Sequence, residues 1–125
     1  MDPVFVTLQQ VLRAHDASLQ RHGGSAGIRD AGLLQSAVDQ PLNDYFYGRA
    51  DLFGIAAAYA FHIAQAQAFL DGNKRTAIAV ALAFLEQNGI ATSTSTDSLY
   101  NAMIGIAERR LTKAALAAVF RELFG

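Results

Sequence analysis

The sequence predicts an all-α fold of about six helices in one compact domain, residues 1–125, with two helices buried at the centre. Apolar residues recur at helical spacing through most of the chain, and good N-cap residues precede several of these runs. The third observation is size. With 52% of its 125 residues hydrophobic, the chain can fill one core and is too short for two comfortable domains.

The first two helices are predicted from capping residues and helix breakers. Thr7 is a plausible N-cap for a helix that ends at the glycine pair 23–24. Asp30 is the next cap, and we expect its short helix to end before Pro41, because the residue preceding a proline disfavours helical backbone. The stretch PLNDYFYGRAD, residues 41–51, has no period and is expected to form a loop or small hairpin.

Two runs that are apolar almost all round are predicted to be the central helices. The first is LFGIAAAYAFHIAQAQ, which follows Asp51 as its cap. The second covers residues 77–85 and is terminated near Asn88-Gly89. After the polar loop IATSTSTD we expect two more helices, in SLYNAMIGIAERR and TKAALAAVFRELF.

Charge and composition exclude several kinds of protein. The chain has 10 basic and 11 acidic residues and a pI near 6.2, so it lacks the electrostatic footprint of a nucleic-acid-binding protein. It has no cysteine, which excludes disulfides, thiolate catalysis and thiolate metal sites. Because it also lacks a secretory signal or a sufficiently long apolar run, we expect a cytoplasmic protein with no membrane partner.

The stretch AQAFLDGNKRTA, residues 66–77, joins the two central helices and carries the candidate site. Gly72 permits a tight turn and Asn73 is a predicted N-cap, so the first amides of the next helix can hold an anion. Lys74 and Arg75 fall in the first helical turn, where the helix dipole disfavours cations by about 0.3–1 kcal/mol each. A bound phosphate would account for this placement.

Alternative interpretations stay open for the charged residues of this loop. Lys74 and Arg75 can instead reach into solvent or pair with Asp71 and Glu86. Asp71 can cap the helix or pair with Arg75, or it can hold Mg²⁺ against the phosphates of a nucleotide. The loop is not a Walker motif, because GNKRT lacks the second glycine at the required spacing and no strand precedes it.

These residues resemble the Doc branch of the Fic family. The family loop reads His-x-Phe-x-(Asp/Asn)-(Gly/Ala)-Asn-Lys-Arg between two central helices of a small helical fold, and this chain has QAFLDGNKR from Gln67 to Arg75. The resemblance extends to RHGGSAGIRDAGLLQSAV before the loop and TAIAVALAFLEQNGI after it. It covers nearly the whole chain.

The resemblance implies the toxin of a toxin–antitoxin pair, a kinase that moves the γ-phosphate of ATP to a threonine of elongation factor Tu and blocks translation. It implies that Asp71 holds Mg²⁺, that Gly72 and Asn73 help to line the anion hole, and that Lys74 and Arg75 bind phosphates. A Phd-like antitoxin is expected as a separate chain, because nothing here resembles the inhibitory Ser/Thr-x-x-x-Glu-Gly/Asn helix of some Fic proteins.

Two hydrophobic features of the chain also acquire roles from the resemblance. Phe69 is expected to anchor the loop in the core. The aromatic segment 45–47 stands where the family has a flap that aligns the target peptide, and a surface loop with half-buried tyrosines is the alternative.

The departure from the family pattern is Gln67. The family has its catalytic histidine at this position, as the base that takes a proton from the attacking hydroxyl, and a glutamine amide has no usable basicity. Loss of a positioned base typically costs on the order of 10²–10⁴ in rate, so whether this chain is an active enzyme stays open. We expect no substitute: His62 should point away from Gln67, and His15 and His22 should be structural.

Two further functions stay open. The fold can serve as a non-catalytic module that binds a nucleotide or a peptide, such as a segment of an antitoxin. AMP transfer, the activity of most Fic proteins, ranks below kinase activity, because Lys74 stands where that branch usually has the second glycine of Gly-Asn-Gly-Arg.

Overall fold

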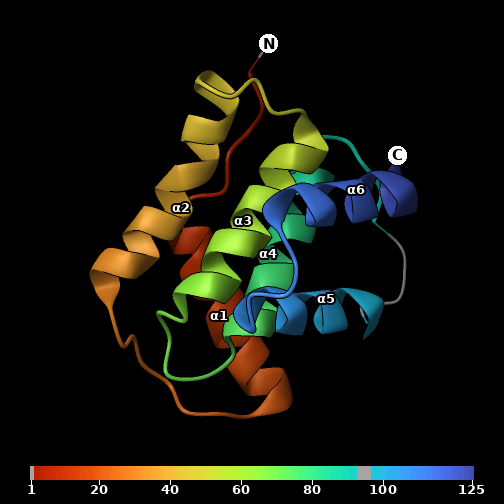
Figure 1. The fold of residues 1–125 in the computed structure, drawn as a ribbon. Helices are drawn as coiled ribbons and strands as arrows, with labels where there is room; N and C mark the ends of the chain where they lie inside the picture. Colours follow the sequence, from red (N-terminus) through yellow and green to blue (C-terminus); the bar gives the residue numbers. More distant parts are fainter. Residues whose placement is uncertain (1, 93–96) are drawn as a thin grey trace.

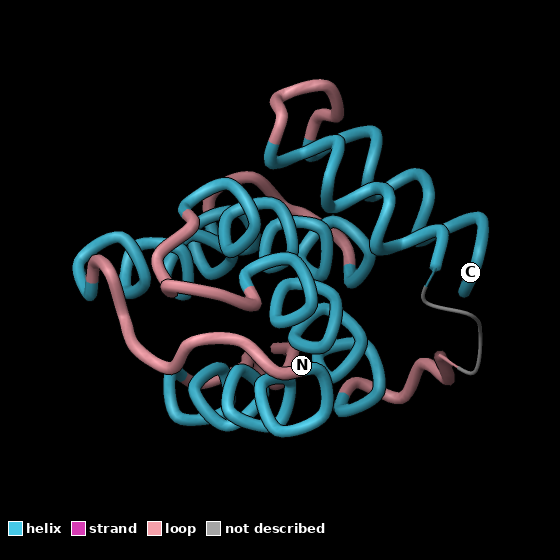
Figure 2. The backbone as a smooth tube through the Cα atoms, turned by 90° about the horizontal axis from the view of Figure 1, so that it is seen from below, coloured by secondary structure: helices cyan, strands magenta, loops and turns pink. Residues whose placement is uncertain are grey.

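The computed structural model describes residues 2–92 and 97–125, and in this part of the chain every regular element is a helix (Figures 1 and 2). The predicted all-α architecture is confirmed. The helices are α1 (Leu8–His22), α2 (Ala31–Phe46), α3 (Leu52–Ala66), α4 (Asn73–Gln87), α5 (Asp97–Ala107) and α6 (Lys113–Phe124). Among the described residues, no helix has both the length and the apolar character that crossing a membrane requires.

The start of most helices is fixed by a side chain that accepts a hydrogen bond from a first-turn amide, as predicted. Thr7 forms a capping box with Gln10, in which each side chain bonds the other residue's backbone amide. Asp30, Asp51 and Thr112 cap α2, α3 and α6, each with a single hydrogen bond from a first-turn amide to the side-chain oxygen. Helix α4 differs, because no side chain caps it.

The third helix, α3, lies at the centre of the molecule and packs against α2, α4, α5 and α6 (Figure 1). Helix α4 packs beside it and also contacts α1 and α5. Both are buried along most of their length, which confirms the predicted central pair. The segment that joins them is therefore attached at both ends to the buried core of the fold.

The second helix is longer than the sequence predicts, because it continues through Pro41 to Phe46. The expected end before Pro41 is therefore wrong, and the expected loop or hairpin of residues 41–51 is wrong for 41–46, whereas residues 47–51 do connect α2 and α3 without regular structure. A proline inside a helix costs about 3 kcal/mol, but packing against α3 and two contacts near the helix end oppose that cost. Lys113 Nζ lies 2.6 Å from Asp44 Oδ2, and the Tyr45 hydroxyl donates to Asp2 Oδ1 at 3.0 Å.

The aromatic segment 45–47 lies far from the loop between α3 and α4, so its expected role as a flap is wrong. It precedes the start of α3, whereas the loop follows the end of α3 at Ala66. A helix of 15 residues is about 22 Å long. In Figure 1 the yellow connection into α3 and the green loop after it lie at opposite ends of that helix. The rings of Tyr45 and Phe46 pack instead on Phe5.

Candidate functional site

The loop between α3 and α4, residues 67–72, is held against the segment that precedes α2. It begins at Gln67, whose left-handed backbone (φ 47°, ψ 45°) ends α3 and turns the chain sharply. The Arg29 amide then donates to the Ala68 carbonyl at 2.6 Å, and the Leu70 amide donates to the Gly27 carbonyl at 3.1 Å. This short antiparallel bridge gives the loop a fixed course.

The sequence predicts that Asn73 is the N-cap of α4, and this is wrong. Asn73 is the first helical residue. Its side chain turns back into the loop, where it accepts from the Phe69 amide and donates to the Phe69 carbonyl, both at 3.0 Å. The N-cap is Gly72, in the left-handed region at φ 81°, where glycine is least strained. Because Gly72 has no side chain, the first amides of α4 receive no side-chain cap.

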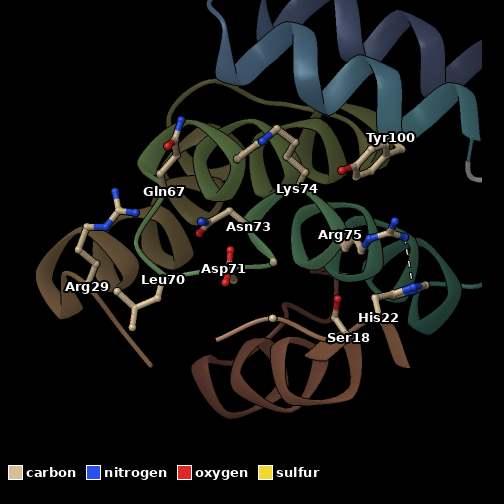
Figure 3. Close-up of a pocket in the computed structure, with 14 residues that line it drawn as sticks. Ser18, His22, Arg29, Gln67, Leu70, Asp71, Asn73, Lys74, Arg75 and Tyr100 are labelled. Atoms are coloured by element: carbon tan, nitrogen blue, oxygen red, sulfur yellow. Dashed lines mark hydrogen bonds between the residues drawn. The ribbon is translucent and has the colours of Figure 1, made fainter. Parts of the chain in front are cut away.

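A pocket of about 480 Å³ lies where this loop, the end of α1 and the start of α4 meet (Figure 3). All six residues predicted for the site line it, although their chemical roles stay predictions. The full lining consists of Ser18, His22, Gly23, Gly24, Arg29, Ala64, Gln67, Leu70, Asp71, Gly72, Asn73, Lys74, Arg75 and Tyr100.

In the part of the chain that the structure describes, Lys74 and Arg75 form no ion pair. The alternative in which they pair with Asp71 and Glu86 is therefore wrong. The Arg75 guanidinium lies over the ring of Tyr100, 4.8 Å from its centroid, and Nη1 donates to His22 Nε2 at 3.4 Å. Both contacts place the guanidinium at the pocket wall and leave its charge unneutralised.

The Asp71 carboxylate neither caps α4 nor pairs with Arg75. Its Oδ2 accepts from the Ser25 amide at 2.8 Å, and the side chain is exposed in the pocket. Across residues 2–92 and 97–125, no group of three histidines or carboxylates could hold a metal by itself. The residues fit a magnesium ion bound by one carboxylate and by the phosphates of a ligand, which is its usual arrangement at nucleotide sites.

Comparison with known proteins now decides the family. A model described as "Fic/DOC family" matches residues 5–85. The chain belongs to the Fic/DOC family. It is 31% identical over 121 residues to "Protein kinase doc" of Escherichia phage P1, a match that covers 96% of this chain and 95% of the phage protein. It is 40% identical over 79 residues to "Toxin Doc" of Mycolicibacterium smegmatis, covering 60% of this chain and 59% of that protein.

None of the three histidines, all of which the structure describes, lies beside Gln67, the position at which the resemblance implies a base. His62, on α3, is not part of the pocket lining, and its Nε2 accepts from Lys113 Nζ at 3.2 Å. His22 does line the pocket, but Figure 3 shows it across the pocket from Gln67, beside Arg75. His15 is buried against the loop. His15 and His62 therefore lie outside the pocket lining, whereas His22 belongs to it.

Several residues of this Fic/DOC pocket were not identified from the sequence. The sequence predicts that the glycine pair 23–24 ends the first helix and begins a turn, and it gives the pair no place in the site, yet the pair passes beside Asp71 and lines the pocket. The sequence predicts a helix around Tyr100 and gives this tyrosine no functional role, yet it lines the pocket. The adjacent glycines were a usable signal, because two flexible residues followed by a polar stretch are typical of a close backbone approach. For Tyr100 the sequence contains no such signal.

The surroundings of His62 predict a pH dependence of stability. Burial, and next the positive charge of Lys113, lower the pKa of His62 from 6.5 to about 4, although Asp44 opposes the shift. Between pH 6.5 and about 4 the unfolded chain therefore binds a proton that the folded chain does not. We expect the melting temperature to fall as the pH is lowered through this window.

The His62→Gln variant keeps a hydrogen-bond acceptor near Lys113 and removes the titration. Thermal melts of both proteins at several pH values between 7 and 4, the window in which His62 titrates, provide the measurement. The variant should lose less stability than the wild-type protein. Parallel curves would show that other groups cause the dependence.

Proposed function

We propose that this Fic/DOC chain is a Doc-like toxin whose pocket binds ATP with Mg²⁺ for transfer of the γ-phosphate. One observation carries the proposal: the uncapped N-terminus of α4, two unpaired cations and an exposed carboxylate face one pocket of about 480 Å³. The printed names of the two Doc relatives, a protein kinase and a toxin, support it.

Each group in the pocket has a distinct part in binding the nucleotide. The amides of the first turn of α4 and the side chains of Lys74 and Arg75 bind the phosphate oxygens. Asp71 supplies the protein carboxylate for the metal. Bound Mg²⁺ neutralises the negative charge that develops on the phosphates during transfer.

The transfer itself needs a proton acceptor, which Gln67 does not supply. A threonine hydroxyl of elongation factor Tu forms a bond to the γ-phosphorus, the bond to the β–γ bridging oxygen breaks, and ADP leaves. The hydroxyl proton must go to a base, and the Gln67 amide cannot accept it at neutral pH. Asp71 could accept the proton only by leaving the metal. We therefore propose that the activity is impaired.

The same substitution favours a second candidate function, a non-catalytic Fic-fold module that binds a nucleotide or a peptide. In that case the pocket holds its ligand and no group is transferred. AMP transfer ranks third, because Lys74 occupies the position of a glycine in the AMP-transferring motif. As the toxin of a pair, the protein would be inhibited by a separate Phd-like antitoxin and would act in the cytoplasm.

Titration calorimetry with ATP and Mg²⁺ tests the binding step that both functions share. Replacing Lys74 or Arg75 with alanine should weaken ATP binding by about 10- to 150-fold, because a hydrogen bond to a charged group contributes roughly 1.5–3 kcal/mol. Arg110→Ala is the matched control, since this arginine pairs with Glu108 on the surface. A folded wild-type protein that does not bind ATP would refute the proposed function.

A further inference from the structure

We propose that His15 and Ser25 position Asp71 for magnesium binding, an inference that rests on the proposed function. Two hydrogen bonds reach Asp71 from α1 and from the turn that follows it. His15 Nε2 donates to the Asp71 carbonyl oxygen at 2.7 Å, and the Ser25 amide donates to Asp71 Oδ2 at 2.8 Å. The two donors, here named the Asp71 clamp, hold the backbone and the carboxylate of the same residue.

His15 is bound to the loop through both its ring face and its ring nitrogen. It is only 6% exposed, and its ring stacks on Phe69 with the centroids 3.7 Å apart and the planes 9° from parallel. Because a carbonyl oxygen can only accept, His15 Nε2 carries the proton in this contact. The buried polar group of α1 therefore has the backbone of Asp71 as its partner.

The turn after α1 comes close enough to Asp71 only because it contains glycine. Gly24 has a φ of 117°, which other residues rarely adopt. A Cβ at this position would lie 3.2 Å from Asp71 Cβ and 3.1 Å from Leu19 Cδ2. Leu19 Cδ2 is a terminal methyl that can move aside, but Asp71 Cβ is tied to the loop backbone, so the glycine favours the close approach that brings the Ser25 amide to the carboxylate.

The clamp leaves Asp71 with one carboxylate oxygen for a cation. The Ser25 amide donates to Oδ2, and no other described residue forms a hydrogen bond to the Asp71 side chain, so Oδ1 is available to a ligand of the pocket that Asp71 lines. Magnesium demands a nearly ideal octahedral geometry and is bound through one or two carboxylates together with phosphates. A carboxylate that is held at both its backbone and its side chain suits that demand. Mutation of a residue that hydrogen-bonds a metal ligand typically lowers metal affinity by about 10- to 100-fold.

The test measures ATP affinity with Mg²⁺ and with EDTA, and the ratio of the two is the magnesium-dependent gain. A positioning role for His15 should affect only this gain. His15→Phe keeps an aromatic ring on Phe69 and removes the donor. Its magnesium-dependent gain should fall by about 10- to 100-fold, whereas affinity in EDTA, which depends on Lys74 and Arg75, should stay at the wild-type value. His15→Gln removes the ring but places an amide donor near the same point, and it should recover most of the gain.

Two outcomes would overturn the clamp alone: a His15→Phe protein that keeps the full gain, or one that loses affinity equally in EDTA, as a merely structural role would require. A wild-type protein that binds ATP equally with and without Mg²⁺ would instead refute the magnesium role of Asp71 within the proposed function.

A second pair of variants tests the other donor and guards against a His15→Phe protein that does not fold. Ser25→Pro removes the amide hydrogen, whereas Ser25→Ala keeps it, so only the proline variant should lose the magnesium-dependent gain. Hydrogen exchange of the ligand-free protein adds a readout independent of nucleotide. The hydrogen-bonded loop amides of Phe69 and Leu70 should exchange faster in His15→Phe than in His15→Gln, and equal rates would count against the clamp.

Discussion

Replacing Gln67 with histidine is expected to raise γ-phosphate transfer to elongation factor Tu by about 10²–10⁴-fold, the usual contribution of a positioned base. The part of the pocket that we propose to bind phosphate is already formed, with Lys74, Arg75 and the uncapped amides of α4 facing one space. The backbone also accepts the change. Position 67 has a φ of 47°, and histidine is among the residues enriched at positive φ.

Transfer assays with γ-labelled and α-labelled ATP distinguish the candidate chemistries. Label from γ-ATP alone on the target identifies a kinase, and label from α-ATP identifies AMP transfer. Gln67→Ala is the matched control, because it removes the amide without supplying a base and should give no gain. If ATP binds to Gln67→His but neither label is transferred, the pocket is a binding site and the non-catalytic function is favoured.

Replacing Phe69 with alanine is expected to lower the free energy of unfolding by about 3–5 kcal/mol. Phe69 is fully buried, its ring is covered by His15, and its backbone holds the side chain of Asn73. Domains of this kind have a total stability of about 5–15 kcal/mol, so the loss would be a large fraction. Urea unfolding followed by circular dichroism measures it.

The neighbouring side chain provides the control for this experiment. Leu70 is 48% exposed, and Leu70→Ala should cost less than about 1 kcal/mol, because surface changes rarely cost more. Equal losses in the two variants would show that Phe69 does not anchor the loop, contrary to its expected role. The contrast tests burial at two adjacent positions of one loop.

Features that depend on neighbours in the sequence could be predicted. Thr7, Asp30 and Asp51 were identified as caps because capping needs only one side-chain oxygen and an amide a few residues further on. The same rule wrongly predicts that Asn73 is an N-cap. Its residue type suits a cap, but the left-handed turn falls at Gly72, and Asn73 bonds back to the loop.

Features that depend on tertiary contacts could not be predicted. Nothing near Pro41 in the sequence reveals that packing on α3 and the bond from Lys113 to Asp44 support the helix beyond it. The walls of the pocket pose the same difficulty. Tyr100 and the turn at Gly24 come from segments far from the motif, so only the folded chain brings Gly24 to Asp71 and Tyr100 to Arg75.

The hydrogen bonds of Asn73 to Phe69, together with the bridge from Ala68 to Arg29, have a consequence for how this site could evolve. They fix the loop during folding, so ligand binding does not have to offset the conformational entropy that is lost when the loop is ordered. None of them involves the side chain at position 67. Selection could therefore exchange that side chain repeatedly, in a single codon, while the backbone of the loop and the pocket it lines stay the same.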